Sequence, residues 1–163
     1  MATLKEPLTF KSESGTLRVY SNSGLITKPL FVMLTQIGCK YCAPALEGFK
    51  TASFEASRYG VPNIQLAVVV SGQTNLPSAA RQSYHLNKSI EIRGAPAFFL
   101  FVDGAYVATH LISQKYIFNP AAAAMEMALF ISRTLVEKKE AKAPVYDPNA
   151  SCLLTMDQAY AKN

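Results

Sequence analysis

The sequence predicts an α/β protein in which a central mixed sheet is covered by helices on both faces. Its most informative feature is a set of three short runs rich in apolar residues, at residues 30–34, 64–70 and 97–102. Such runs are typical of strands that are buried on both faces. Because both faces need covering, and helical patterns occur between and after the runs, we expect a three-layer α/β/α sandwich.

A helix is expected at residues 45–59, between the first two apolar runs. Its apolar side chains fall on one stripe, formed by Leu46, Phe49, Ala52 and Ala56. Since a helix joins them, the first two strands should be parallel with a right-handed crossover. A further short helix is expected at residues 77–86.

The third apolar run continues into a predicted hairpin and a last helix. Asp103-Gly104 is a strong hairpin signal, and residues 105–112 should return as an antiparallel partner. Asn119 caps the last helix and Pro120 occupies its first position. The inward stripe of this helix is predicted to consist of Met125, Ala128, Leu129, Ser132, Leu135 and Val136.

We divide the chain into three parts on the basis of these patterns. Residues 1–29 form an N-terminal extension in which residues 16–20 could be an edge strand. Residues 30–139 form the folded domain. Residues 140–163 form a C-terminal tail, in which 151–160 would be a short docked helix or a mobile segment.

Composition and charge narrow the possible partners. The 163 residues carry a net charge of +5, but the lysines and arginines are scattered. No basic stripe interleaved with aromatic residues is visible, so we do not expect nucleic-acid binding.

No run approaches the ~20 apolar residues of a membrane span. Without a leader-like apolar stretch near the start we expect a cytoplasmic protein, although a periplasmic or secreted protein whose leader had been removed would show the same pattern.

Two cysteines stand three residues apart directly after the first apolar run, in the segment Cys39-Lys40-Tyr41-Cys42. A strand before this pair and a helix after it would place the thiols at a helix N-terminus, where unpaired N–H groups favour a thiolate. Cys39 would attack a substrate disulfide and Cys42 would resolve the mixed disulfide. The charge of Lys40 should lower the pKa of Cys39. Tyr41 offers substrate a stacking edge and a hydroxyl.

A second motif, Gly94-Ala95-Pro96, stands directly before the third apolar run. The two motifs, in this order, resemble the thioredoxin superfamily over about residues 30–139. The resemblance implies a thioredoxin-like fold in which Ala95–Pro96 is a cis peptide facing the dithiol. It also implies that Ala95 and Pro96 expose backbone that pairs with a substrate peptide, and that the proline blocks metal capture by the cysteines.

The chain departs from classical thioredoxin around the dithiol. Gly38 stands where the family usually has tryptophan, Lys40-Tyr41 replaces Gly-Pro, and Met33 occupies the position of a buried acid. The pattern looks closer to glutaredoxin-like or disulfide-isomerase-like relatives. With Lys40 and a helix terminus stabilising the thiolate, we expect a couple between roughly −270 and −120 mV.

The sequence therefore predicts a protein thiol–disulfide oxidoreductase that needs no metal or organic cofactor. Its substrate would be a protein or peptide thiol or disulfide, with electrons from glutathione or a partner reductase. The alternative is a peptide- or protein-binding module, or an assembly subunit, with little or no turnover. A zinc site would have only Cys152, His85 and His110 to add to the pair. We expect Cys152 to be a spare thiol, with a regulatory or intermolecular disulfide as the alternative.

Overall fold

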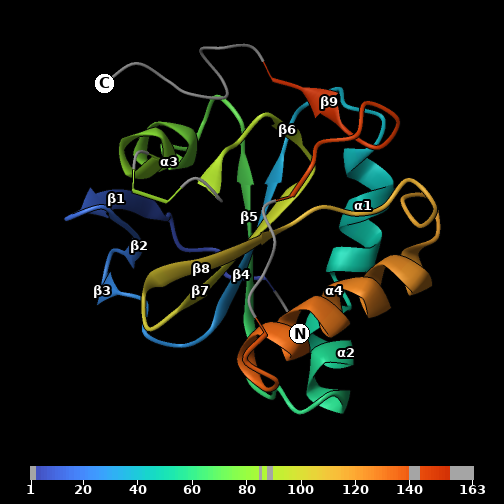
Figure 1. The fold of residues 1–163 in the computed structure, drawn as a ribbon, viewed down its shortest axis with the longest axis horizontal. Helices are drawn as coiled ribbons and strands as arrows, with labels where there is room; N and C mark the ends of the chain where they lie inside the picture. Colours follow the sequence, from blue (N-terminus) through green and yellow to red (C-terminus); the bar gives the residue numbers. More distant parts are fainter. Residues whose placement is uncertain (1–2, 85, 88–89, 140–143, 155–163) are drawn as a thin grey trace.

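The computed structural model describes residues 3–84, 86–87, 90–139 and 144–154, and its described part is built around one curled mixed sheet (Figure 1). The strand order is β1-β2-β8-β7-β4-β5, with β3 paired to β2. A separate small sheet pairs β6 with β9. The strands are β1 (Thr9–Glu13), β2 (Thr16–Ser21), β3 (Gly24–Leu25), β4 (Leu30–Thr35), β5 (Gln65–Val70), β6 (Gly94–Ala95), β7 (Ala97–Val102), β8 (Ala105–His110) and β9 (Cys152–Leu153).

Strand β4 lies at the centre of the core and is buried along almost its whole length. It pairs in parallel with β5 and antiparallel with β7. The predicted parallel pairing of the first two apolar runs is therefore confirmed. Residues of β4 alternate between two apolar clusters, with Phe31 and Met33 on one face and Leu30, Val32 and Leu34 on the other. Both faces of the strand consequently need a covering layer.

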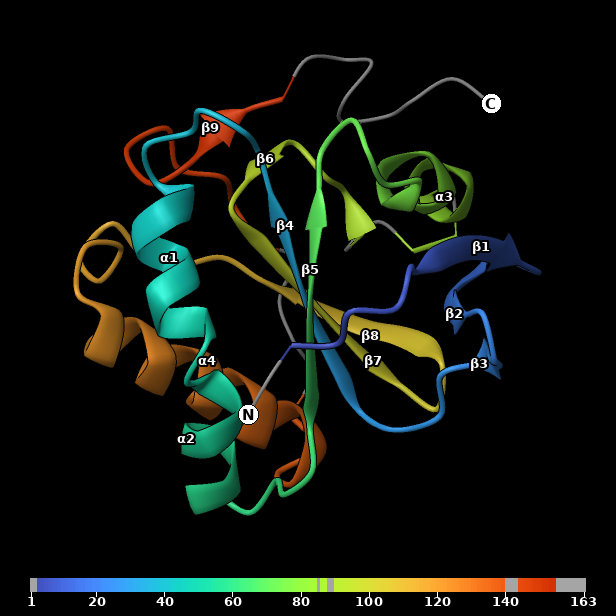
Figure 2. The ribbon, with the colours of Figure 1, turned by 180° about the vertical axis from the view of Figure 1, so that it is seen from behind.

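Helices supply part of the cover on both faces, as predicted (Figures 1 and 2). The helices are α1 (Cys42–Phe49), α2 (Ala52–Arg58), α3 (Leu76–Tyr84) and α4 (Pro120–Leu135). Helices α1, α2 and α4 pack over the cluster that contains Phe31, whose ring stacks on Phe98 with centroids 5.7 Å apart. Helix α3 packs over the opposite cluster beside β1.

The single helix expected at residues 45–59 is two helices. Helix α1 ends at Phe49 and α2 begins at Ala52, and Thr51 between them leaves the helical region with φ −105° and ψ 1°. The first of them begins at Cys42 rather than at residue 45. Pro44 fits its first turn because the N–H groups of that turn have no intrahelical partner, so the missing N–H removes no helical bond.

The predicted inward face of α4 was partly wrong. Ala128 and Ser132 are buried, but Met125 and Val136 are 46% and 52% exposed. The buried positions include Ala123, Ala124, Met127 and Ile131. Small residues lie inward because α4 approaches α1 closely: a Cβ on Gly48 would stand 2.9 Å from the carbonyl oxygen of Pro120.

The hairpin and the N-terminal strands complete the sheet. The β7–β8 turn is at Asp103-Gly104, as predicted, and both residues have positive φ, 53° and 78°. The strand predicted near residues 16–20 is β2, which lies between β1 and β8 rather than at an edge. Residues of β1 and β2 are core residues, with Phe10 and Val19 almost fully buried.

The N-cap of α4 gives a direct test of the predicted helix start. The side chain of Asn119 accepts a hydrogen bond from the Ala122 N–H at 3.2 Å. Replacing it (Asn119→Ala) should lower the free energy of unfolding by about 1 kcal/mol, measured by denaturant titration. Asn119→Asp keeps an accepting oxygen and serves as the control. Equal losses in the two variants would contradict the capping role.

Candidate redox site

Cys39 lies in the turn between β4 and α1, and Cys42 is the first residue of that helix. The Cys42 N–H donates to the Cys39 carbonyl oxygen at 3.1 Å, so the two cysteines belong to one tight turn. Both are buried, with 8% of Cys39 and 4% of Cys42 exposed. The local sequence produces this placement because β4 is followed by Gly38, whose positive φ of 84° redirects the chain.

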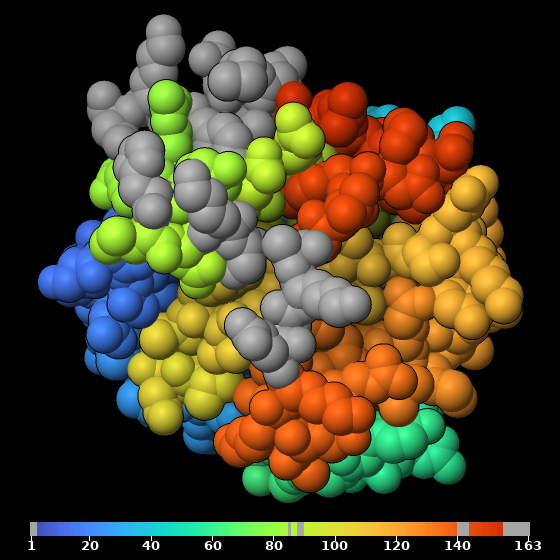
Figure 3. Space-filling view, viewed as in Figure 1, coloured from blue at the N-terminus to red at the C-terminus, as the bar shows by residue number. Residues whose placement is uncertain are grey.

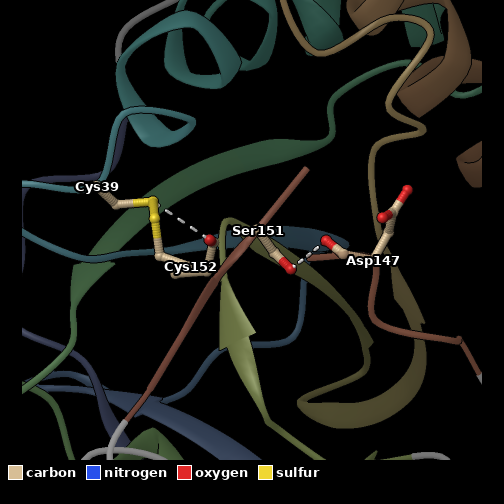
Figure 4. The surroundings of a disulfide bond; sticks show 5 residues. Cys39, Asp147, Ser151 and Cys152 are labelled. Carbon is tan, nitrogen blue, oxygen red and sulfur yellow. Dashed lines mark hydrogen bonds between the residues drawn. A yellow bond between two sulfur atoms is a disulfide. The ribbon is translucent and has the colours of Figure 1, made fainter. Parts of the chain in front are cut away.

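The second predicted motif forms the opposite wall of the site. The Ala95–Pro96 peptide bond is cis. The Cys39 sulfur lies 3.6 Å from the Ala95 carbonyl oxygen, a contact drawn in Figure 4. Two motifs that are 56 residues apart in the sequence therefore meet at one point.

Cys39 forms a disulfide with Cys152, at an S–S distance of 2.10 Å (Figure 4). The expectation that Cys152 is a spare thiol in the tail was therefore wrong. The bond spans a sequence separation of 113 residues, and Cys42 remains a free, buried cysteine. Cys152 reaches Cys39 because the end of the described chain returns to pair with β6 as strand β9.

Strand β9 pairs antiparallel with β6, so it lies beside the residues expected to hold substrate backbone. Gly94 is opposite Leu153 and Ala95 is opposite Cys152. The Leu154 N–H adds a hydrogen bond to the Arg93 carbonyl oxygen at 2.9 Å. Cys152 therefore approaches Cys39 as part of an extended segment held by its main chain.

The residues before β9 are fixed by a turn and a tyrosine. The Tyr146 hydroxyl donates to the Glu91 carbonyl oxygen at 3.0 Å. The Asp147 carbonyl oxygen accepts from the Ala150 N–H at 3.0 Å and from the Ser151 hydroxyl at 2.8 Å (Figure 4). Residues 153 and 154 continue extended or irregular, so no helix begins at 151; the rest of the expected helix, 155–160, lies outside the described residues.

The tail segment, defined here as residues 144–154, lies close against Gly94. It forms part of the molecular surface, coloured red in Figure 3. A Cβ on Gly94 would stand 3.0 Å from the Cys152 carbonyl oxygen and 3.3 Å from a ring carbon of Tyr146. A hollow of about 400 Å³ lies beside it, with Pro96, Ile112, Asp147 and Ser151 among its lining residues. The missing side chain at Gly94 therefore permits this packing.

The remaining predicted residues surround the dithiol. The Lys40 ammonium nitrogen lies 5.1 Å from the centroid of the Tyr41 ring. Tyr41 is only 9% exposed and packs against Phe118 at 5.9 Å, so it presents little of its ring to solvent. Met33, at the position of the family's buried acid, is fully buried between Val68 and Phe98 in the sheet.

Several apolar side chains near the disulfide are exposed. Ile37, two residues before Cys39, is 78% exposed, and Leu153, next to Cys152, is 66% exposed. Phe118, which contacts Tyr41, is 65% exposed. Exposed apolar groups gathered at a reactive group are typical of surfaces that contact another protein or peptide.

The described residues form neither a cluster of metal ligands nor a membrane-spanning helix. No three His, Cys, Asp or Glu side chains there gather so as to hold a metal ion. His110, one of the ligands considered for zinc, lies instead with its Nε2 3.3 Å from Glu126 Oε1, and His85 lies outside the described residues. None of the described helices is long and apolar enough to cross a membrane.

No protein-family model matches the sequence, and no curated protein is significantly similar to it. The function of the site must therefore be inferred from its geometry. That geometry unites Cys39, Cys42, Ala95 and Pro96, and it adds Cys152, which the sequence signalled only as an unpaired third cysteine.

The long-range disulfide should contribute measurably to stability. Removing it by Cys152→Ser should lower the free energy of unfolding of the oxidised protein by about 2–4 kcal/mol, because the bond restricts a long loop in the unfolded chain. Denaturant titration with and without reductant measures this loss. Cys42→Ser, which retains the disulfide, should keep most of the stability. Equal stability of Cys152→Ser and the wild type under oxidising conditions would contradict the bond.

Proposed function

We propose that this protein is a thiol–disulfide oxidoreductase with a thioredoxin-like fold, acting through Cys39 and Cys42 on protein or peptide disulfides. One observation carries the proposal. The Cys39 sulfur is bonded to a cysteine on an extended segment that pairs with Ala95, beside the cis peptide bond to Pro96. This is the arrangement expected of a nucleophilic cysteine caught with a peptide substrate.

The element order supports the thioredoxin-like assignment. A buried strand leads into the cysteines, a helical segment leads to a parallel strand, and a hairpin and a long helix follow. The cis peptide stands directly before the hairpin's first strand. Cys39 and Cys42 thus follow the end of β4, where α1 and the cis peptide bond come together.

The reaction proceeds by two thiol–disulfide exchanges. The Cys39 thiolate attacks one sulfur of a substrate disulfide, forming a mixed disulfide and releasing the other sulfur as a thiolate. The Cys42 thiolate then attacks the Cys39 sulfur, which releases the substrate thiol and leaves a Cys39–Cys42 disulfide. Two electrons pass to the substrate, and glutathione or a partner reductase returns them. Each released thiolate takes a proton from solvent.

The protein contributes charge stabilisation and positioning to these steps. Cys39 stands just before the N-terminal turn of α1, where the helix dipole favours a negative charge on its sulfur. Lys40 adds a positive charge at the neighbouring position. The Ala95 and Gly94 backbone would align the substrate chain, as it aligns β9.

A binding module remains the second candidate, and the closed site favours it. Cys39 is 8% exposed, whereas Ile37, Phe118 and Leu153 next to the site are broadly exposed. A protein that only docks a partner on this apolar surface would keep its partner after loss of Cys39. Turnover separates the two candidates.

Disulfide reduction by substituted proteins tests the oxidoreductase directly. In an insulin-reduction assay with dithiothreitol, Cys39→Ser should lose turnover because no other cysteine occupies the nucleophilic position. The double variant Cys42→Ser with Cys152→Ser, in which no second thiol can attack Cys39, should form a mixed disulfide with substrate and release it slowly, which mass spectrometry of acid-quenched samples detects.

Two results would count against this assignment. Unchanged turnover in Cys39→Ser would exclude Cys39 as the nucleophile. Absence of turnover in the wild type and also in Cys152→Ser, which frees Cys39 from the tail, would leave the binding module as the better account.

The redox potential of the dithiol tests the proposed thiolate stabilisation. In Cys152→Ser, where only Cys39 and Cys42 can pair, equilibration with glutathione should give a potential between roughly −270 and −120 mV. Lys40→Gln should make this couple more reducing, because loss of the positive charge destabilises the reduced thiolate form. A potential below that of thioredoxin, or one unmoved by Lys40→Gln, would contradict the role of Lys40.

A further inference from the structure

Cys152 occupies the place that the proposed reaction reserves for substrate. Its sulfur is bonded to Cys39, and its strand pairs with Gly94 and Ala95. The nearby Cys42 is left as a free thiol. The described structure therefore contains a mixed disulfide and its resolving thiol within a single chain.

We propose that the tail segment is a tethered plug of the active site, held by a disulfide that Cys42 can exchange. The Cys39–Cys152 disulfide closes the site to other chains, and Cys42 reopens it by exchanging that bond for Cys39–Cys42. This inference rests on the proposed oxidoreductase function and concerns the regulation of the same site.

The exchange balances without an outside oxidant. The Cys42 thiolate attacks the Cys39 sulfur, a Cys39–Cys42 bond forms, and the Cys39–Cys152 bond breaks. Cys152 leaves as a thiolate, which takes from solvent the proton that Cys42 lost. The number of disulfides is unchanged, so the two states differ only in which thiol is free. In the reverse direction Cys152 attacks Cys39 and closes the site.

The contacts of the tail segment hold it specifically at the active site. The segment is held by the ladder to β6, by the Leu154 N–H on Arg93, and by the Tyr146 hydroxyl on Glu91. Because Gly94 has no side chain, the Cys152 carbonyl oxygen can approach it closely; a Cβ at this position would crowd that oxygen. Attachment to the same chain gives Cys152 a high effective concentration at Cys39. External disulfides must compete with this tethered occupant.

The plug also indicates the form of substrate that the site accepts. Small residues, Ala150 and Ser151, precede Cys152 and are buried, whereas Leu153 after it is exposed. A peptide with small residues before its cysteine, and with an extended main chain from the cysteine onward, would fit the same ladder. A peptide with the sequence of residues 144–154 is therefore a matched probe.

Disulfide mapping tests the two states of the plug. The purified full-length protein is alkylated at low pH and digested without reduction. Wild type should yield the Cys39–Cys152 linkage. On addition of dilute glutathione, wild type should release Cys152 severalfold faster than Cys42→Ser, which lacks the exchanging thiol. Equal release rates, or a wild type in which Cys152 is always free, would overturn the proposal.

Turnover tests whether the plug restrains the enzyme. Cys152→Ser should reduce insulin severalfold faster than wild type. Adding the 144–154 peptide should slow this variant, whereas the same peptide with serine in place of cysteine should not. Tyr146→Phe, which keeps all three cysteines, should accelerate wild type more weakly. Its control is Tyr20→Phe, which removes a hydroxyl bonded to Glu13 on the distant β1–β2 pair.

The outcomes separate the plug from the oxidoreductase function. Wild-type turnover that is unchanged or lowered by Cys152→Ser overturns the plug and leaves the oxidoreductase intact. Turnover that survives Cys39→Ser, or that no variant shows, contradicts the oxidoreductase and with it the plug as its regulator.

Discussion

The burial of β4 on both faces is the constraint on which the rest of the structure depends. A strand with apolar side chains on both faces needs two covering layers, and α1, α2 and α4 supply one while α3 supplies helical cover on the other. At its end, β4, the N-terminus of α1 and the β6 segment come together. Cys39 lies at this point because the chain leaves β4 there. The position of Cys39 thus follows from the way in which β4 is buried in the core.

Local patterns predicted much of this fold because their signals are strong and short-range. Runs rich in apolar residues located β4, β5 and β7, and the Asp103-Gly104 pair located the hairpin. The helix break after Phe49 was missed, and so was the true inward face of α4, which depends on the close approach of this helix to Gly48. No local pattern in the sequence encodes which face of a helix a distant partner will approach.

The site was predictable only in part for a similar reason. Cys39, Cys42 and Pro96 were singled out because each belongs to a short motif. Cys152 has no motif around it, and its partner stands 113 residues away. Strand β9 is two residues long, which is too short for a periodic signal. The odd number of cysteines was the available hint, and it does not specify a partner.

Because β9 is so short, the Cys39–Cys152 disulfide and the docking of the tail segment depend on one another. Two paired residues and a few hydrogen bonds, each worth about 1 kcal/mol net, offset little of the entropy lost when the tail segment is ordered. The disulfide alone, without the ladder, would hold Cys152 near Cys39 but would not keep its main chain paired with Ala95. Together the disulfide and the ladder keep the site closed, and a single thiol–disulfide exchange at Cys39 can open it. A weak strand secured by one reversible covalent bond is therefore suited to opening and closing a site, whereas a longer strand would keep the site closed after the bond was broken.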